Sequence, residues 1–315
     1  MFIYILSAIS FVLTCFSLKL IIPLLSKKLL DSPNQRSSHK TPIPSGGGIS
    51  FVFFGTIACL FLDFWIPLMS LPLAIFGLID DVMNISKSIR FIVQIFTVIL
   101  ISSKSPLYGT FLSYGFNSLI EIIFFLFLIV IGTTIINFVN FMDGLDGFVS
   151  LNLVIIFFVA ILLGQVAILP IAAGVLGFLI WNWSPAKVFM GDIGSTFLGA
   201  IFFGIIVSFE NPQYSLFLVV TGIPLLGDAF ICLIRRLIYG QNIFLPHKSH
   251  LYQRLNQAGF SHKNVSLIYS VLTFISGTYI FIFKLNYLPV YFLFIILVYI
   301  YMDKSLAIPF KHRSD

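Results

Sequence analysis

The chain has 315 residues, of which 59% are hydrophobic and only 10% are charged, and its mean hydropathy is +1.05. A soluble globular domain has too little interior to enclose so much apolar surface, so this composition excludes that class. The formal net charge of +6 does not indicate nucleic-acid binding, because Lys and Arg are spread over short segments instead of gathering on one face.

Apolar runs recur along the whole chain, each bounded by charged residues, Pro, Gly or Asn. A helix needs about 20 mostly apolar residues to cross the hydrocarbon core of a bilayer. We therefore predict an all-α polytopic membrane protein with about eleven transmembrane helices, ten or twelve staying open where short runs pair as hairpins. In chain order the predicted spans are 2–25, 46–62, 64–80, 90–104, 118–138, 148–163, 166–182, 195–209, 215–234, 265–284 and 287–302.

The distribution of positive charge predicts the orientation of these spans, since Lys and Arg are retained on the cytoplasmic side. With the N-terminus periplasmic and the C-terminus cytoplasmic, the inner segments hold all of the 18 Lys and Arg residues except Lys19, Lys104 and Lys284. We predict a single membrane domain, 1–315. Its functional loops face the cytoplasm near 26–45, 80–90, 137–147, 183–195 and 235–264.

Acidic residues gather at the inner ends of the predicted spans. Burying a carboxylate near lipid costs several kcal/mol, so such residues are functional candidates. Six of the twelve Asp and Glu residues belong to four clusters at or near these ends: Asp80-Asp81, Asn137-x-x-Asn140-x-x-Asp143-Gly-x-Asp146-Gly, Met190-Gly-Asp192-x-Gly-Ser195, and Asp228, which lies deeper in the ninth span. Each motif alone also fits a helix cap or a glycine-rich turn, and Asp228 alone also fits a partner of Arg235. Unrelated caps would be scattered over both faces of the membrane, whereas these share one.

Converging carboxylates with adjacent glycines suit a hard divalent cation that carries phosphate oxygens. Mg²⁺ takes a few carboxylates, waters and substrate phosphates as ligands, and Mn²⁺ is a possible substitute. Cys15, Cys59 and Cys232 stand alone in apolar runs without metal-ligand spacing, which argues against zinc. The segment Pro246-His-Lys-Ser-His-Leu-Tyr-Gln-Arg254 adds basic groups that suit a diphosphate, and His39 and Lys40 add two more from the first inner loop. A basic inner loop also serves simply to fix orientation. His262 and His312 fit no pattern and are interpreted as surface residues.

Five ordered elements together resemble the polyprenyl-phosphate sugar-1-phosphate transferases, over nearly the whole chain. They are the three acidic motifs, the segment Ser38-His-Lys-Thr-Pro with Gly46-Gly-Gly, and His247-x-x-His250 with Tyr252-Gln253-Arg254. The resemblance implies an Mg²⁺-dependent phosphotransferase. It would transfer a HexNAc-1-phosphate from a UDP-HexNAc donor to undecaprenyl phosphate and release UMP, in contact with membrane lipids and without nucleic acid; a homodimer stays open.

The resemblance also implies roles for individual residues. Asp80, with Asp81 beside it, would be catalytic by orienting or deprotonating the lipid phosphate. Asp192 would be a metal ligand with Asp81 as helper. Asn137, Asn140, Asp143 and Asp146 would bind the nucleotide sugar, and Lys40, His247, His250 and Arg254 the diphosphate or lipid phosphate. Direct in-line attack and a covalent Asp intermediate both stay open.

The histidine motif bears on the donor sugar. The branch of the family that transfers phospho-muramoyl-pentapeptide usually has three consecutive histidines, and the GlcNAc-specific enterobacterial branch usually reads His-x-His-His. His247-x-x-His250-x-Tyr252-Gln253 is more similar to O-antigen initiators that act on 6-deoxy sugars such as QuiNAc or FucNAc, while GlcNAc stays open. A cation-coupled secondary transporter is the main alternative outside the family. It would need acidic residues near the membrane midplane and related sequence halves, and no internal repeat is evident.

Overall fold

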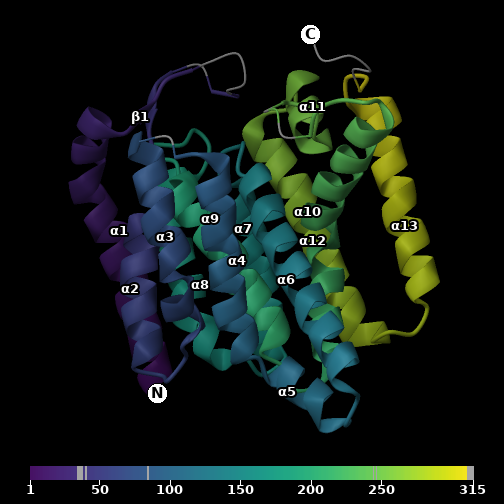
Figure 1. The fold of residues 1–315 in the computed structure, drawn as a ribbon. Helices are drawn as coiled ribbons and strands as arrows, with labels where there is room; N and C mark the ends of the chain where they lie inside the picture. Colours follow the sequence, from purple (N-terminus) through teal and green to yellow (C-terminus); the bar gives the residue numbers. More distant parts are fainter. Residues whose placement is uncertain (34–37, 40, 84, 244, 246, 311–315) are drawn as a thin grey trace.

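The computed structural model describes residues 1–33, 38–39, 41–83, 85–243, 245 and 247–310, and shows a bundle of roughly aligned helices (Figure 1). Two strands, β1 (Leu30–Asp31) and β2 (Ile43–Pro44), pair antiparallel, Leu30 with Pro44 and Asp31 with Ile43. The helices are α1 (Phe2–Lys28), α2 (Ile49–Leu60), α3 (Ile66–Met83), α4 (Lys87–Ser103), α5 (Pro106–Ser113), α6 (Ser118–Phe141), α7 (Phe148–Leu162), η1 (Val166–Ile168), α8 (Leu169–Asn182), α9 (Gly191–Val207), α10 (Pro212–Ile238), α11 (Leu251–Gln257), α12 (His262–Phe283), α13 (Leu288–Tyr301) and η2 (Met302–Leu306).

The predicted all-α class is confirmed, and each predicted apolar segment contains a helix. The predicted count of about eleven spans is not supported. Among the described residues, six helices are long and apolar enough to cross a membrane, or seven if α4 and α5, bent by 58°, form one span. The apolar helices α2, α7, α9 and the η1–α8 pair are too short by this test, since at 1.5 Å per residue each falls below the thickness of the hydrocarbon core.

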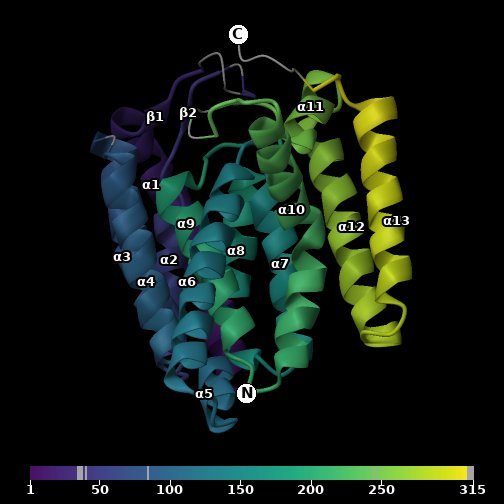
Figure 2. The same cartoon turned by 45° about the vertical axis from the view of Figure 1, so that its right-hand side comes forward.

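Helix α9 is the centre of the bundle. Every side chain from Ile193 to Val207 is buried, and α3 and α6 pack along it while α4, α7 and α10 also contact it. By contrast, α13 lies at the edge of the bundle beside α12, and its sole buried side chain is that of Tyr291 (Figures 1 and 2). The apolar sequences of α9 and α13 are therefore used differently, one inside the protein and the other at its surface.

The ends of several helices meet at the end of the bundle that also holds the β1–β2 pair and α11, opposite the N-terminus (Figure 1). The chain after β2 is attached to the start of α9. The Phe189 N–H donates to the Pro44 carbonyl at 2.8 Å, and the N–H groups of Gly47 and Gly48 donate to the carbonyls of Phe189 and Met190 at 2.9 and 3.0 Å. The first loop and the α8–α9 loop therefore form one structural unit.

Asp228 anchors the short helix α11 on the same end. Its fully buried carboxylate accepts hydrogen bonds from the N–H groups of Leu251 and Tyr252 at 2.8 and 2.9 Å and from the Tyr269 hydroxyl at 2.6 Å. Arg235 instead makes a bidentate pair with Asp303, both bonds at 2.8 Å. The interpretation of Asp228 as the partner of Arg235 is therefore wrong, because the two side chains take partners from different elements.

Candidate active site

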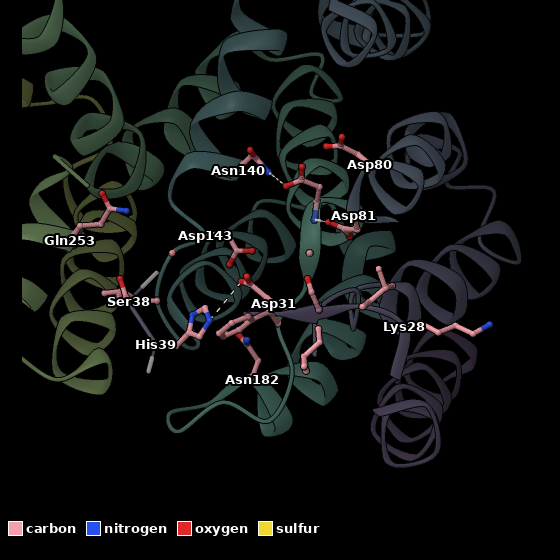
Figure 3. A pocket seen from close by; sticks show the side chains of 18 of the residues that line it. Lys28, Asp31, Ser38, His39, Asp80, Asp81, Asn140, Asp143, Asn182 and Gln253 are labelled. Carbon is pink, nitrogen blue, oxygen red and sulfur yellow. Dashed lines mark hydrogen bonds and ion pairs between the residues drawn. The ribbon is translucent and has the colours of Figure 1, made fainter. Parts of the chain in front are cut away.

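A cavity of about 540 Å³ lies at the end of the bundle where the loops after α3, α6 and α8 meet. This volume is within the roughly 300–1,000 Å³ of small-molecule sites. Figure 3 shows Asp80 and Asp81 on one side of the cavity and Ser38, His39 and Gln253 on the other, with Asp143 and Asp31 between them. The polar and charged lining consists of Lys28, Asp31, Ser38, His39, Ser45, Asp80, Asp81, Arg90, Asn140, Asp143, Asn182, Asp192 and Gln253.

Asp192, in the first turn of α9, lies at the meeting point of the acidic helix ends. One of its carboxylate oxygens accepts a hydrogen bond from Asn140 Nδ2 at 2.8 Å, and the other is 3.0 Å from Arg90 Nη1. Arg90, from the first turn of α4, also pairs with Asp80. The Arg90 guanidinium therefore links two of the predicted site carboxylates, and Asn140 orients one of them.

Asp80 and Asp81 are adjacent at the end of α3 but have different partners, as neighbouring residues on a helix point in different directions. Asp80 accepts the Ile85 N–H at 2.6 Å in addition to its pair with Arg90. Asp81 accepts the backbone N–H groups of Asp192 at 2.9 Å and Ile193 at 3.4 Å. Asp81 therefore caps the N-terminus of α9, where a negative charge is favourable, while still lining the cavity.

Gly77 allows α3 to approach α9 closely enough for this cap. A Cβ atom at Gly77 would lie 2.6 Å from the carbonyl carbon of Asp192 and 2.6 Å from the Ile193 nitrogen, closer than real Cβ contacts. The absence of a side chain at this position thus sets the separation between the Asp80-Asp81 pair and Asp192.

Asp143, in the α6–α7 turn, is surrounded by other carboxylates. Burial and the nearby carboxylates of Asp192, Asp81 and Asp146 raise the pKa of Asp143 to about 8. A cluster of oxygen ligands whose mutual repulsion favours proton uptake is well suited to a hard divalent cation. Asp143 and Asp192, with Asp81 beside them, are therefore the residues that fit Mg²⁺.

We predict that Asp143→Asn stabilises the protein in EDTA as the pH rises. Unfolded chains lose this proton near pH 4, whereas the folded protein retains it up to about pH 8, so the wild type loses stability between these values. The asparagine variant has no charge to lose. Its thermal midpoint in detergent should match that of the wild type near pH 4 and exceed it by roughly 2–4 °C or more at pH 8.5. The control is Asp63→Asn, which makes the same change at an exposed acid. If the difference in thermal midpoint between Asp143→Asn and the wild type did not grow with pH, the raised pKa of Asp143 would be contradicted.

Asn137 and Asp146 lie behind the cavity wall, outside its described lining. Asn137 exchanges amide hydrogen bonds with Gln94 from α4, at 2.9 and 3.1 Å. Asp146 accepts the Ala186 N–H at 3.1 Å, and its other oxygen is 3.1 Å from His262 Nδ1. Burial alone would raise the pKa of Asp146, but the hydrogen bond and charge of His262, with the Ala186 N–H, lower it. Both residues support the wall from behind.

His247 and His250 also lie outside the described lining, with ring centroids 4.9 Å apart. Burial, with the nearby Arg236 guanidinium, lowers the pKa of both imidazoles to about 3, so they are neutral at pH 7. Cys232 of α10 offers its sulfur within 4.8 Å of them, a proximity that sequence spacing did not indicate. The positive Arg236 beside this trio opposes a cation there.

Arg254 lies outside the described lining, with its guanidinium 3% exposed. It pairs with Asp303 and donates to the Ile308 carbonyl at 2.8 Å, so it attaches α11 to the chain after α13. Lys40 lies outside the described residues. Of the predicted site residues, the structure therefore brings Asp80, Asp81, Asn140, Asp143 and Asp192 into one cavity.

Several lining residues were not predicted as site residues. Arg90 was counted only as a topological charge, although its place at an inner helix start, ten positions after Asp80, was an available signal. Asp31 and Gln253 also line the cavity. His39, which the sequence singled out with Lys40 as a basic group, does line the cavity; its ring packs edge-on against Phe189 at 5.0 Å between centroids and lies 4.0 Å from the Asp31 carboxylate. The sequence offered no periodic signal for these contacts.

Comparison with known proteins gives consistent matches. Residues 64–210 match the profile of glycosyl transferase family 4. An undecaprenyl-phosphate alpha-N-acetylglucosaminyl 1-phosphate transferase of Thermotoga maritima is 31% identical over 237 residues, covering 75% of this chain and 76% of the relative. The Escherichia coli K12 protein of the same name is 30% identical over 271 residues, covering 76% and 72%. A probable undecaprenyl-phosphate N-acetylglucosaminyl 1-phosphate transferase of Bacillus subtilis is 28% identical, covering 85% and 82%.

The fold and the cavity define an all-α membrane protein with an acidic site at one end of its helix bundle. Within that class, the matched profile and relatives assign the chain further. It belongs to the polyprenyl-phosphate N-acetylhexosamine-1-phosphate transferase family.

Proposed function

We propose that this protein transfers a HexNAc-1-phosphate from a UDP-sugar to undecaprenyl phosphate on the cytoplasmic face of the bacterial inner membrane. A phosphate oxygen of the lipid attacks the phosphorus attached to the sugar, the phosphoanhydride bond to the nucleotide breaks, and UMP leaves. The observation that carries this proposal is the convergence of Asp80, Asp81, Asp143 and Asp192 in one cavity with Arg90. The relatives carry names for the same kind of reaction.

The location of the cavity supports the pairing of these two substrates. Lipid phosphate lies at the level of the headgroups, and a nucleotide sugar arrives from the cytosol, so their reaction needs a polar site at the end of a membrane bundle. The acidic loops and the β1–β2 pair gather at that end (Figure 1). In-line phosphoryl transfer depends mainly on positioning and on stabilisation of charge, which fixed carboxylates and a guanidinium provide.

In this proposal each acidic side chain of the cavity has a distinct role in the transfer. Asp80, held by Ile85 and Arg90, orients the lipid phosphate or accepts its proton. Asp192 and Asp143, with Asp81, would hold Mg²⁺, which when bound would neutralise charge on phosphate oxygens. Asn140 keeps Asp192 oriented at 2.8 Å. Both direct attack by the lipid phosphate and attack through an aspartyl intermediate are compatible with this division.

The donor is held by the remaining polar lining in this proposal. His39, Gln253 and Lys28 reach the cavity directly and suit the nucleotide and its diphosphate. Asn137 and Asp146 act by supporting the wall, while the diphosphate roles of Lys40, His247, His250 and Arg254 rest on the family resemblance. The donor proposed is UDP-GlcNAc or a UDP-linked 6-deoxy-HexNAc, for initiation of O-antigen or a related envelope glycan.

The structure offers little for the transporter alternative. Asp228 is the deep carboxylate on which that interpretation depends, and it is fully buried with its oxygens accepting hydrogen bonds from Leu251, Tyr252 and Tyr269. A carboxylate so engaged holds α11 in place instead of facing a pathway for a coupling ion.

The test is a transfer assay with a panel of donors. Membrane vesicles containing the protein, Mg²⁺ and undecaprenyl phosphate are incubated separately with radiolabelled UDP-GlcNAc, UDP-QuiNAc and UDP-FucNAc. We expect one of these donors to yield a chloroform-soluble product whose mass equals undecaprenyl diphosphate plus the sugar minus one water, with one UMP released per product. EDTA should stop the reaction, and Mn²⁺ should restore part of it. Absence of lipid-linked product with every UDP-HexNAc, in vesicles that contain folded protein, would refute the proposal.

A further inference from the structure

His262 is interpreted from the sequence as a surface residue, but the structure places it between two loops of the candidate site. It is the first residue of α12, and its side chain is only 15% exposed. Its ring Nδ1 lies 3.1 Å from Asp146 Oδ1, and its Nε2 lies 3.3 Å from the Ser38 carbonyl oxygen. The surface interpretation is therefore wrong for this histidine.

Both residues that His262 contacts belong to loops that line the cavity. Asp146 closes the α6–α7 turn, whose residues Asp143, Gly144 and Leu145 line the cavity. Ser38 itself lines the cavity, and so does the next residue, His39. These two loops are far apart in the sequence and meet at the imidazole of His262.

The imidazole suits this position because its two nitrogens point in different directions and reach different loops. Nε2 lies within hydrogen-bonding distance of the Ser38 carbonyl oxygen. Nδ1 accepts a hydrogen bond from the Asp146 N–H at 3.4 Å and lies 3.1 Å from the Asp146 carboxylate oxygen. One ring nitrogen therefore contacts Asp146 and the other contacts Ser38.

We propose that His262 is a positioning residue that holds the Asp143 loop and the Ser38–His39 segment at a fixed separation for binding of the nucleotide-sugar donor. This inference rests on the proposed function. His262 does not line the cavity, so it acts through Asp146 and Ser38 and takes no part in bond making. Its loss should weaken donor binding more than it slows the bound complex, and should leave binding of the lipid acceptor nearly unchanged.

The experiment compares His262→Ala with His262→Gln in the purified full-length protein. We expect His262→Ala to raise KM for the UDP-sugar by about tenfold, since the contacts of the ring with both loops are lost, with a smaller change in kcat and in KM for undecaprenyl phosphate. Glutamine keeps a polar amide with both an acceptor oxygen and an N–H donor near Asp146, so it should restore part of the donor KM. Equilibrium binding of radiolabelled UDP-sugar gives a second readout that needs no turnover.

Two variants on the same helix separate positioning from simple support of the fold. Ser266→Ala removes a 3.0 Å hydrogen bond from the Ser266 hydroxyl to the Asp146 carbonyl, which docks α12 on the same turn without touching the carboxylate. Lys263→Ala alters the exposed neighbouring residue. Both should retain the wild-type donor KM.

The possible outcomes distinguish this inference from the proposed function. If the wild type transfers sugar phosphate but His262→Ala has an unchanged donor KM and affinity, the positioning role is refuted and the function stands. The role is likewise refuted if Ser266→Ala raises the donor KM as much as His262→Ala does. It is also refuted if His262→Gln has the same donor KM as His262→Ala although these two variants have the same thermal midpoint. If the wild type transfers nothing from any UDP-HexNAc, the proposed function fails first.

Discussion

Replacing Asp192 with Asn is expected to abolish formation of the lipid-linked product, lowering turnover by about 10³-fold or more. The carboxylate of Asp192 meets both Arg90, at 3.0 Å, and Asn140, at 2.8 Å, at the point where three helix ends converge. An amide of the same shape keeps the packing but removes the charge that would hold a cation and balance the guanidinium. The measurement is the rate of chloroform-soluble product per folded protein in detergent.

The control for this prediction is Glu210→Gln, which makes the same chemical change at an exposed acid just beyond the other end of α9. This variant should retain wild-type turnover. Both proteins should insert into the membrane in equal amounts. Turnover of purified Asp192→Asn at the wild-type rate would overturn the role given to this carboxylate.

Replacing Gly77 with Ala is expected to disable the site without touching any charged group. The added methyl carbon would lie 2.6 Å from the backbone of Asp192 and Ile193, so α3 has to move away from α9. Such overpacking costs about 1–3 kcal/mol and more where backbone must shift. The movement would separate Asp81 from the N–H groups that it caps, and we expect turnover to fall by more than about tenfold.

Gly227→Ala is the matched control for Gly77→Ala. Gly227 also lies within a helix, α10, but a Cβ there would meet only the Ile223 side chain at an ordinary 3.8 Å. This variant should be as active as the wild type and equally or slightly more stable, since alanine favours helix over glycine. If Gly77→Ala retained full turnover and thermal stability, the close contact between α3 and α9 would not be what positions the acidic pair.

Much of the candidate site could be predicted because the chemistry of a membrane protein restricts where carboxylates lie. Asp80, Asp143 and Asp192 each stand at the end of an apolar run, and charge counting places these ends on one face of the membrane. The structure brings all three into one cavity. This convergence could be predicted without knowing any distance in the fold, because helices of one bundle that end at the same membrane face have their ends near one another.

Contacts between distant segments could not be predicted in this way. Arg254 stands among other basic residues in the sequence, yet its guanidinium pairs with Asp303, almost fifty positions later. His262 shows no spacing pattern, because its partners Asp146 and Ser38 come from two other loops. Periodicity within one segment carries no information on which loop a side chain will meet.

The predicted number of spans exceeds the six or seven described helices that are long and apolar enough to cross a membrane, for a related reason. A helix that faces lipid and a helix enclosed by protein can have the same hydropathy. Helix α9 is as apolar as an ordinary span, although all its side chains from Ile193 to Val207 are buried in the protein. Length distinguishes them, as α9 has only 17 residues. Whether a helix face contacts lipid or other helices is decided by the assembled bundle and not by the sequence of that helix alone.

The enclosure of α9 also determines how the protein responds to its membrane. A bilayer of different acyl-chain length acts by hydrophobic mismatch on the helices that it touches, which tilt to match its thickness. Peripheral helices such as α13, with a single buried side chain, take up that tilt, while α9 is insulated from the acyl chains by its neighbours. Asp192 therefore keeps its depth relative to the surrounding carboxylates, and we expect the geometry of the cavity to be insensitive to the thickness of the host membrane.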